Sequence, residues 1–187
     1  DGIRSISSES DLDPDLNGRS IKRRLLELQN PATDRLADRE RFNAIQEFVR
    51  SVLGDSTITI DIPHDLSTIH ITLSGSTLPI ENMGTGIHEV VILAAAATVV
   101  QDAIVCIEEP EVHLHPLLQR KLLRYLAEGT SNQYVIATHS AHMLDSEIGH
   151  IFHLTMENGR SLARYAGAAR ERSQVCADLG YRPSDLV

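Results

Sequence analysis

The sequence is short of aromatic residues. Tryptophan is absent, and the 187 residues include only four tyrosines and three phenylalanines. The hydrophobic core must therefore be built mainly from leucine, isoleucine, valine and alanine, with which the apolar share still reaches an ordinary 42%. No apolar run is long enough to cross a bilayer, and residues 90–100 instead predict a buried helix. We therefore expect a cytoplasmic protein with no membrane contact.

Cysteine and positive charge are also scarce. The two cysteines, Cys106 and Cys176, lie in apolar surroundings, which favours buried reduced thiols over a disulfide. The formal net charge of −9 makes the chain a poor binder of phosphate backbones. The basic residues 22–24 are the best local candidate for such a contact, and a solvated helix face explains them better. We expect DNA to be contacted only through other parts of a longer protein.

The first part of the chain predicts a loop followed by two helices. Residues 1–18 are rich in Ser, Asp and Pro and show no apolar period, which predicts a loop. Apolar spacing predicts one helix over residues 20–29 with Ser20 as its cap. A second helix is predicted over residues 33–53 with Thr33 as its cap, and a glycine ends it.

Beyond these helices the pattern changes twice. Alternating polar and apolar residues at 57–62 and 69–73 predict a small antiparallel ribbon. The rest predicts helices at 87–100 and 116–129, and strands at 103–107, 134–137, 151–155 and 162–165, with a tight turn at Asn158-Gly159. Apolar strands separated by helices indicate an α/β fold with a mostly parallel sheet. We assign residues 1–80 and 81–187 to two regions of one partial domain.

Two adjacent carboxylates follow the apolar strand at 103–107. Glu108 and Glu109 stand at its carboxyl end, which is the edge where open α/β sheets bind ligands. Carboxylates at that edge can hold a hard cation through water and orient an attacking water molecule. The alternative is a solvated junction between strand and loop.

Two further segments could reach the same crevice. Gly84-Thr85-Gly86 comes directly before a predicted helix, and free N–H groups at a helix start attract anions. A plain turn is the alternative. His139 leaves the end of the strand at 134–137, so its side chain can meet the two glutamates, although a lone histidine is often structural.

His113 and His115 form a His-x-His pair beside the carboxylates. With Glu109 and His139 they could hold a transition metal, which would make the protein a metal-dependent hydrolase. Against this, Pro116 opens a helix, so His115 is equally suited to cap it.

In order and approximate spacing these segments resemble the second half of an ABC-type nucleotide-binding domain. They are most similar to ATPases of the OLD (overcoming lysogenization defect) type and related AAA-like ATPases, which share their head architecture with SMC proteins. Residues 108–111 resemble the Walker B segment. The resemblance implies that Glu108 supports Mg²⁺ and that Glu109 is the catalytic glutamate. It implies the carboxy-terminal lobe of a P-loop NTPase fold.

The remaining segments resemble motifs that act between two subunits. Residues 83–88 resemble the signature motif, which implies that Gly84, Thr85 and Gly86 contact the γ-phosphate of ATP held by the opposite subunit. Residues 113–116, with His115, resemble the D-loop, and His139 resembles the switch histidine. The cofactors implied are ATP and Mg²⁺, and the partner implied is a second copy of the chain.

The sequence departs from this family pattern at three points. Gly84 stands where many ABC proteins have serine, and Glu108 is longer than the usual aspartate. The phosphate loop Gly-x-x-x-x-Gly-Lys-Ser/Thr, known as Walker A, occurs nowhere in the sequence. We therefore expect this chain alone to be inactive and ATP to require a missing lobe. A non-catalytic assembly module is the main alternative.

We expect the chain to be a fragment of a longer protein. It begins with Asp1 rather than methionine. Its final stretch, 177–185, resembles the segment through which OLD-type proteins continue into a Toprim nuclease domain.

Overall fold

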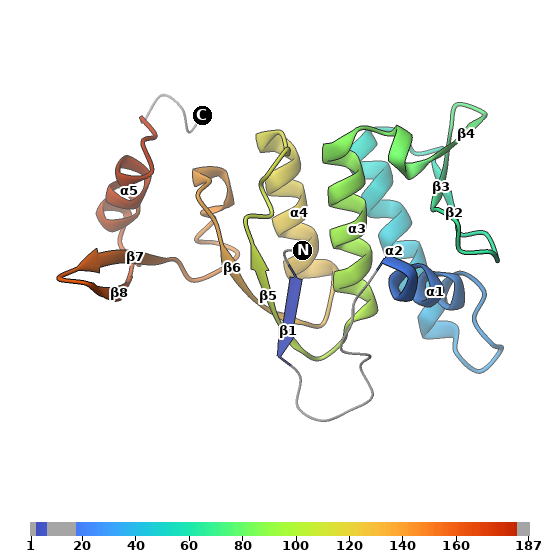
Figure 1. Cartoon of the computed structure of the whole chain (residues 1–187), viewed down its shortest axis with the longest axis horizontal. Coiled ribbons are helices and arrows are strands. Elements are labelled where there is room, and N and C mark those ends of the chain that lie inside the picture. The colour runs from blue at the N-terminus through green and yellow to red at the C-terminus, as the bar shows by residue number, and fades with distance from the viewer. Residues whose placement is uncertain (1–2, 7–17, 183–187) are drawn as a thin grey trace.

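The computed structural model describes residues 3–6 and 18–182. Its elements follow one another along the long axis of the molecule (Figure 1). A β-ribbon lies at one end, four helices and a sheet occupy the middle, and a β-hairpin with a short helix lies at the other end. No helix in the described part of the chain is both long and apolar enough to span a membrane.

Four helices form the main core. They are α1 (Gly18–Gln29), α2 (Leu36–Leu53), α3 (Thr85–Val99) and α4 (Pro116–Gly129). α1, α2 and α4 contribute aliphatic stripes at helical spacing, whereas α3 is buried at consecutive positions, as its apolar run predicts. The fully buried side chains of the four helices include Leu28, Ile45, Val49, Val90, Val91, Leu122 and Leu126. Leucine, isoleucine, valine and alanine thus build the core that the scarcity of aromatics requires.

The predicted helix starts are wrong at two places. α1 begins at Gly18, so Ser20 lies inside the helix rather than capping it. α2 begins three residues after Thr33, behind Arg35, and has no side-chain cap. The predicted end of α2 is confirmed, because Gly54 adopts the left-handed conformation at φ 71°.

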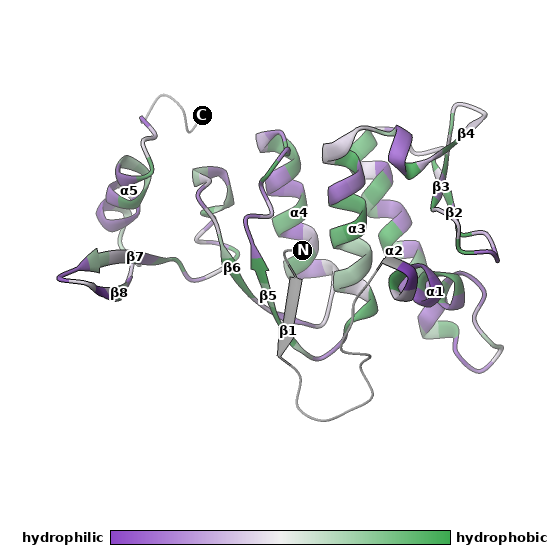
Figure 2. Ribbon diagram, viewed as in Figure 1, coloured by the Kyte–Doolittle hydropathy of each residue, from purple (hydrophilic) through white to green (hydrophobic). Residues whose placement is uncertain are grey.

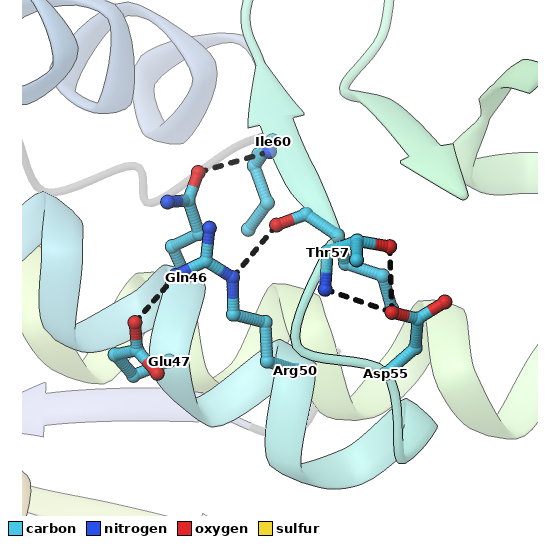
Figure 3. A network of polar contacts seen from close by, with 7 residues as sticks. Gln46, Glu47, Arg50, Asp55, Thr57 and Ile60 are labelled. Atoms are coloured by element: carbon cyan, nitrogen blue, oxygen red, sulfur yellow. Dashed lines mark hydrogen bonds and ion pairs between the residues drawn. The ribbon is translucent and has the colours of Figure 1, made fainter. Parts of the chain in front are cut away.

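The ribbon has three antiparallel strands instead of the two predicted. They are β2 (Thr59–Asp61), β3 (His70–Leu73) and β4 (Ser76–Pro79), in that order. Figure 3 shows how α2 holds the ribbon: Arg50 Nε donates to Ile58 O at 2.8 Å, and Ile60 N donates to Gln46 Oε1 at 3.2 Å. These bonds satisfy backbone groups of Ile58 and Ile60, two buried residues in and next to β2.

A three-stranded sheet packs beside α3 and α4 (Figure 1). Its order is β1 (Ile3–Ile6), β5 (Ile104–Glu108) and β6 (Gln133–Ala137). β5 and β6 are parallel, as predicted, whereas β1 pairs with β5 in the antiparallel sense. The predicted loop at 1–18 is therefore wrong for Ile3–Ile6, and residues 7–17 lie outside the described part.

The sheet is covered on one face only. Val105 and Ile107 are buried against the helices, while Ile104 is 47% exposed and Val135 61% exposed on the other face. Figure 2 shows hydrophobic residues along β5 and β6. An apolar face of the sheet therefore remains open to solvent, although strands as apolar as these are typical of sheets covered on both faces. Cys106 on β5 and Cys176 are half-buried and free.

The last elements form a separate small unit. β7 (Phe152–Glu157) and β8 (Arg160–Tyr165) make an isolated antiparallel hairpin, and α5 (Ala169–Asp178) follows. The predicted turn is confirmed, with positive φ at both Asn158 and Gly159. The prediction of a mostly parallel sheet is wrong for β7, because β7 does not join β5 and β6. A second cluster of buried residues, Ile151, Ala166 and Val175, holds this unit.

Tyr125 is a partly buried tyrosine that packs against the main core. Its ring stacks on Phe48 with centroids 4.3 Å apart, and its hydroxyl lies 2.6 Å from Thr98 Oγ1. Burial raises the pKa of Tyr125 to about 12. The phenol stays neutral in the folded chain while an unfolded chain ionises near pH 10, so stability is lost as the pH rises between these values.

Tyr125→Phe should therefore change the alkaline sensitivity of the fold. At pH 7 the variant should be about 1 kcal/mol less stable, because it loses the hydrogen bond to Thr98. Wild type should lose roughly 1.4 kcal/mol per pH unit above pH 10, so that the difference closes near pH 11. Urea unfolding at pH 7, 9 and 11 measures this. A difference that stays constant over the range would contradict the account.

Candidate functional site

The parallel pairing of β5 and β6 brings two chemical segments to one edge. Glu108 lies opposite Ala137 in the register, and Glu109 N donates to Ala137 O at 2.8 Å. The next residues of both strands therefore leave the sheet together. His139 Nε2 lies 3.5 Å from Glu109 Oε1. The structure thus brings together the acid and the histidine that the sequence singles out.

These side chains are open to solvent. The side chains of Glu109 and His139 are 56% and 80% exposed, so their ion pair adds little to stability. Glu108 is exposed too, and within the described residues its carboxylate has no hydrogen-bond or ion-pair partner. Two adjacent acids at a sheet edge, one of them without a partner in the described residues, are suited to bind a hard cation such as Mg²⁺, which prefers oxygen ligands.

The backbone at Glu109 is strained. Its φ is 47°, a left-handed value that non-glycine residues adopt at a cost of about 1 kcal/mol or more. His113, in the same loop, has φ 61°. Strain of this kind persists where surrounding contacts fix the chain, and it concentrates at functional sites.

The start of α3 has the features of an anion site. Gly84 precedes the helix with φ 84° and has no side chain with which to cap it. The first N–H groups of the helix, from Thr85 and Gly86 onward, therefore lack intrahelical partners. Together with the positive end of the helix dipole they are suited to a phosphate group.

The loop at residues 109–115 packs against this helix start. A Cβ atom at Gly86 would lie 2.5 Å from the carbonyl oxygen of His113, so only glycine fits there without movement. His113 Nδ1 also lies 3.2 Å from Glu89 Oε2. The segment resembling the signature motif and the segment resembling the D-loop are thus neighbours in space.

His115 is a helix cap in this structure. Its Nδ1 accepts a hydrogen bond from Leu117 N at 3.3 Å, and Pro116 occupies the first turn of α4. The histidines of the metal-hydrolase alternative are separated: His113 pairs with Glu89, and His139 pairs with Glu109. Within residues 3–6 and 18–182, no three His, Cys, Asp or Glu side chains are grouped to hold a metal ion.

Sequence reasoning missed three polar residues beside the site. Glu111 Oε1 accepts from His139 N at 2.6 Å, and Ser140 Oγ donates to Gln119 Oε1 at 2.6 Å. Glu111 gives no signal of its own in the sequence, because it closely follows the acids Glu108 and Glu109. Gln119 carries a signal that could have found it, because it falls on the apolar stripe of α4 with Leu122, where a polar residue needs a partner.

Comparison with known proteins identifies the fold and the family. Residues 4–144 match the family described as the AAA ATPase domain. A solved structure concerned with ATP-driven dimerization and DNA-stimulated activation of SMC ATPases superposes with a TM-score of 0.55 at 14% identity, covering 75% of this chain and 94% of that one. An SmcHead bound to the C-winged helix domain of ScpA gives 0.54 at 13%, covering 80% and 51%. These low identities show similarity of fold alone. No curated protein matches the chain.

The contact between Gly86 and His113 can be tested by substitution. Gly86→Ala should destabilise the fold by about 1–3 kcal/mol, because overlap with the His113 carbonyl outweighs the gain of roughly 1 kcal/mol in helix propensity. Gly149→Ala is the matched control, since a Cβ there meets nothing within 4 Å, and it should be nearly neutral. Urea unfolding compares them. A Gly86→Ala variant as stable as wild type would show that the two segments do not touch.

Proposed function

The chain belongs to the AAA ATPase domain family, and from this premise we propose that it is the carboxy-terminal part of an ABC-type ATPase head. ATP would be hydrolysed at the edge that carries Glu108, Glu109 and His139. The observation that carries the proposal is the 3.5 Å approach of His139 Nε2 to Glu109 Oε1 at the carboxyl end of two parallel strands. The likeness to SMC heads, which is one of fold, supports it.

Each residue has a distinct role in this proposal. Glu109 positions and polarises the water that attacks, and His139 contacts the γ-phosphate that receives it. Glu108 would help to hold Mg²⁺, which would offset negative charge on the phosphates. ATP with Mg²⁺ supplies the phosphoryl group, and the protein contributes position and charge stabilisation. The exposure of all three side chains is consistent with a site that a further element completes.

We assign the missing element to a lobe that carries the phosphate loop. No Walker A sequence occurs in the 187 residues, so these residues alone cannot cradle the β- and γ-phosphates. The apolar face with Ile104 and Val135 is open, and in the described structure β6 pairs on one edge only, with β5. A lobe seated on this face would bury both side chains and bring its phosphate loop to the edge of the sheet.

A second copy of the chain would supply the other side of the nucleotide. Gly84, Thr85 and Gly86 lie at the start of α3, and Gly86 contacts the loop that leads from His113 to His115. In a symmetric dimer this surface would close over the nucleotide of the partner. An OLD-type role, a following Toprim nuclease and DNA contact through other parts of a longer protein extend this proposal. The last three residues of the Toprim-like stretch, 183–185, lie outside the described part.

A non-catalytic assembly module is the second candidate. It is favoured by two features: Gly84 replaces the signature serine, and the phosphate loop is absent. Such a module would keep the fold and the dimer surface but would show no turnover of ATP when the missing lobe is supplied.

Hydrolysis assays separate the two candidates. The 187-residue chain alone should not hydrolyse ATP, whereas a longer form that supplies a phosphate loop should. Glu109→Gln in the longer form should lower kcat by roughly 100-fold or more, because the base that orients the water is lost.

The control is Glu147→Gln, which changes an exposed acid away from the sheet edge and should leave the rate unchanged. Turnover by the short chain would contradict the need for a further lobe, and full activity of Glu109→Gln would exclude the assigned role of Glu109. A longer form that contains a phosphate loop and is inactive throughout would favour the assembly module.

A further inference from the structure

We propose that Glu111 and Gln119 are positioning residues that hold the His139 loop beside Glu109 and couple it to the loop at 113–115. The proposal rests on the proposed function, since it concerns how that site is kept in order and how a partner subunit would act on it. Glu111 lies within residues 108–111, which resemble the Walker B segment, but the resemblance gives a role only to Glu108 and Glu109 there. Gln119 lies outside all of the motifs.

Glu111 reaches across the edge of the sheet. Its Oε1 accepts from the backbone N–H of His139 at 2.6 Å, although the two residues are 28 positions apart. A hydrogen bond to a carboxylate is stronger than one between neutral groups. This bond fixes the backbone of His139. A second hydrogen bond, from Glu109 N to Ala137 O, fixes the end of β6 two residues earlier. Two residues of the loop after β5, Glu109 and Glu111, therefore hold the segment that carries His139.

The anchoring by Glu111 comes at a cost in stability. Its second carboxylate oxygen, Oε2, is buried and has no hydrogen-bond partner in the described structure. A buried acceptor without a partner costs about 1–3 kcal/mol. A contribution to stability therefore does not explain why a half-buried carboxylate lies here. A role in positioning His139 does explain it.

Gln119 bridges two loops from α4. It is 6% exposed, and both ends of its amide are used. Its Nε2 donates to Leu114 O at 2.9 Å, and its Oε1 accepts from Ser140 Oγ at 2.6 Å. Ser140 is 4% exposed and directly follows His139. One buried side chain therefore ties the loop that faces α3 to the loop that carries the imidazole.

These contacts make one rigid connection between a surface and the site. The loop at 109–115 is strained at both Glu109 and His113, and it is seated on Gly86. A partner subunit that pressed on His113 would move Leu114, and through Gln119 it would move the loop of His139. The buried hydrogen bonds of Gln119 can carry such a shift, because packed side chains and hydrogen-bond networks carry energetic coupling between sites.

Amide hydrogen exchange of this chain tests the anchoring without ATP. Glu111→Ala should accelerate exchange of the His139 amide by roughly tenfold or more, because a charge-assisted hydrogen bond is lost. Glu111→Gln keeps an acceptor oxygen and should stay close to wild type. Glu147→Ala is the matched control. Unchanged exchange at His139 in Glu111→Ala would overturn the anchoring.

The coupling arm of the experiment uses Gln119→Ala beside Arg120→Ala, an exposed neighbour on the same helix. Only Gln119→Ala should shift the amide resonances of both Leu114 and His139. If Glu111→Ala fails to fold, the chemical shift of the His139 amide proton in Glu111→Gln tests the anchoring instead. Replacement of a charged acceptor by a neutral one must move this resonance upfield. A Gln119→Ala spectrum with shifts confined to the Leu114 loop would overturn the coupling.

Kinetics of the ATP-hydrolysing longer form give the functional readout. Glu111→Ala should lower kcat by roughly tenfold or more with KM unchanged, and Glu111→Gln should restore most of it. Normal turnover in Glu111→Ala, or an effect on KM alone, would overturn the positioning role. If the longer form shows no hydrolysis at all, the proposed function fails, and the exchange data still decide whether Glu111 and Gln119 hold the loops together.

Discussion

The structure depends above all on the parallel pairing of β5 with β6. Burial of Val105 and Ile107 against the helices fixes how far β5 extends, and the register then sets Glu108 opposite Ala137. Because both strands run the same way, the acids that follow one and the histidine that follows the other leave the sheet at one edge. A shift of one residue would turn the buried side chains outward and separate Glu109 from His139.

The loop after β5 adds a second constraint to the same edge. It turns at the strained residues Glu109 and His113, rests on the helix start at Gly86, and reaches the neighbouring loop through Glu111. The acids on the edge are exposed, and the sheet face beside them is apolar and open. This combination is what the proposed function requires of one half of an ATP site. In that proposal another lobe and another subunit would cover the surface that faces water in this chain.

Local patterns account for the parts of the fold that the sequence predicts. Apolar periodicity predicts α1 and α2, a continuous apolar run predicts α3, and Pro116 predicts the start of α4. β1 was missed because its partner β5 lies some hundred residues away, beyond any local pattern. β7 looked like a core strand because its apolar residues resemble those of β6, yet sheet membership depends on tertiary pairing. Glu111 and Gln119 escaped for the same reason, since their roles exist only when distant loops meet.

The most direct measurement is a structure of the longer form bound to Mg²⁺ and a non-hydrolysable ATP analogue. The account predicts the γ-phosphate at the carboxyl edge of β5 and β6, with His139 in direct hydrogen-bond reach at about 3 Å and Glu109 one water molecule away. It also predicts a phosphate loop seated beside the open face of Ile104 and Val135. A nucleotide bound elsewhere, with Glu109 and His139 remote from its γ-phosphate, would contradict the account.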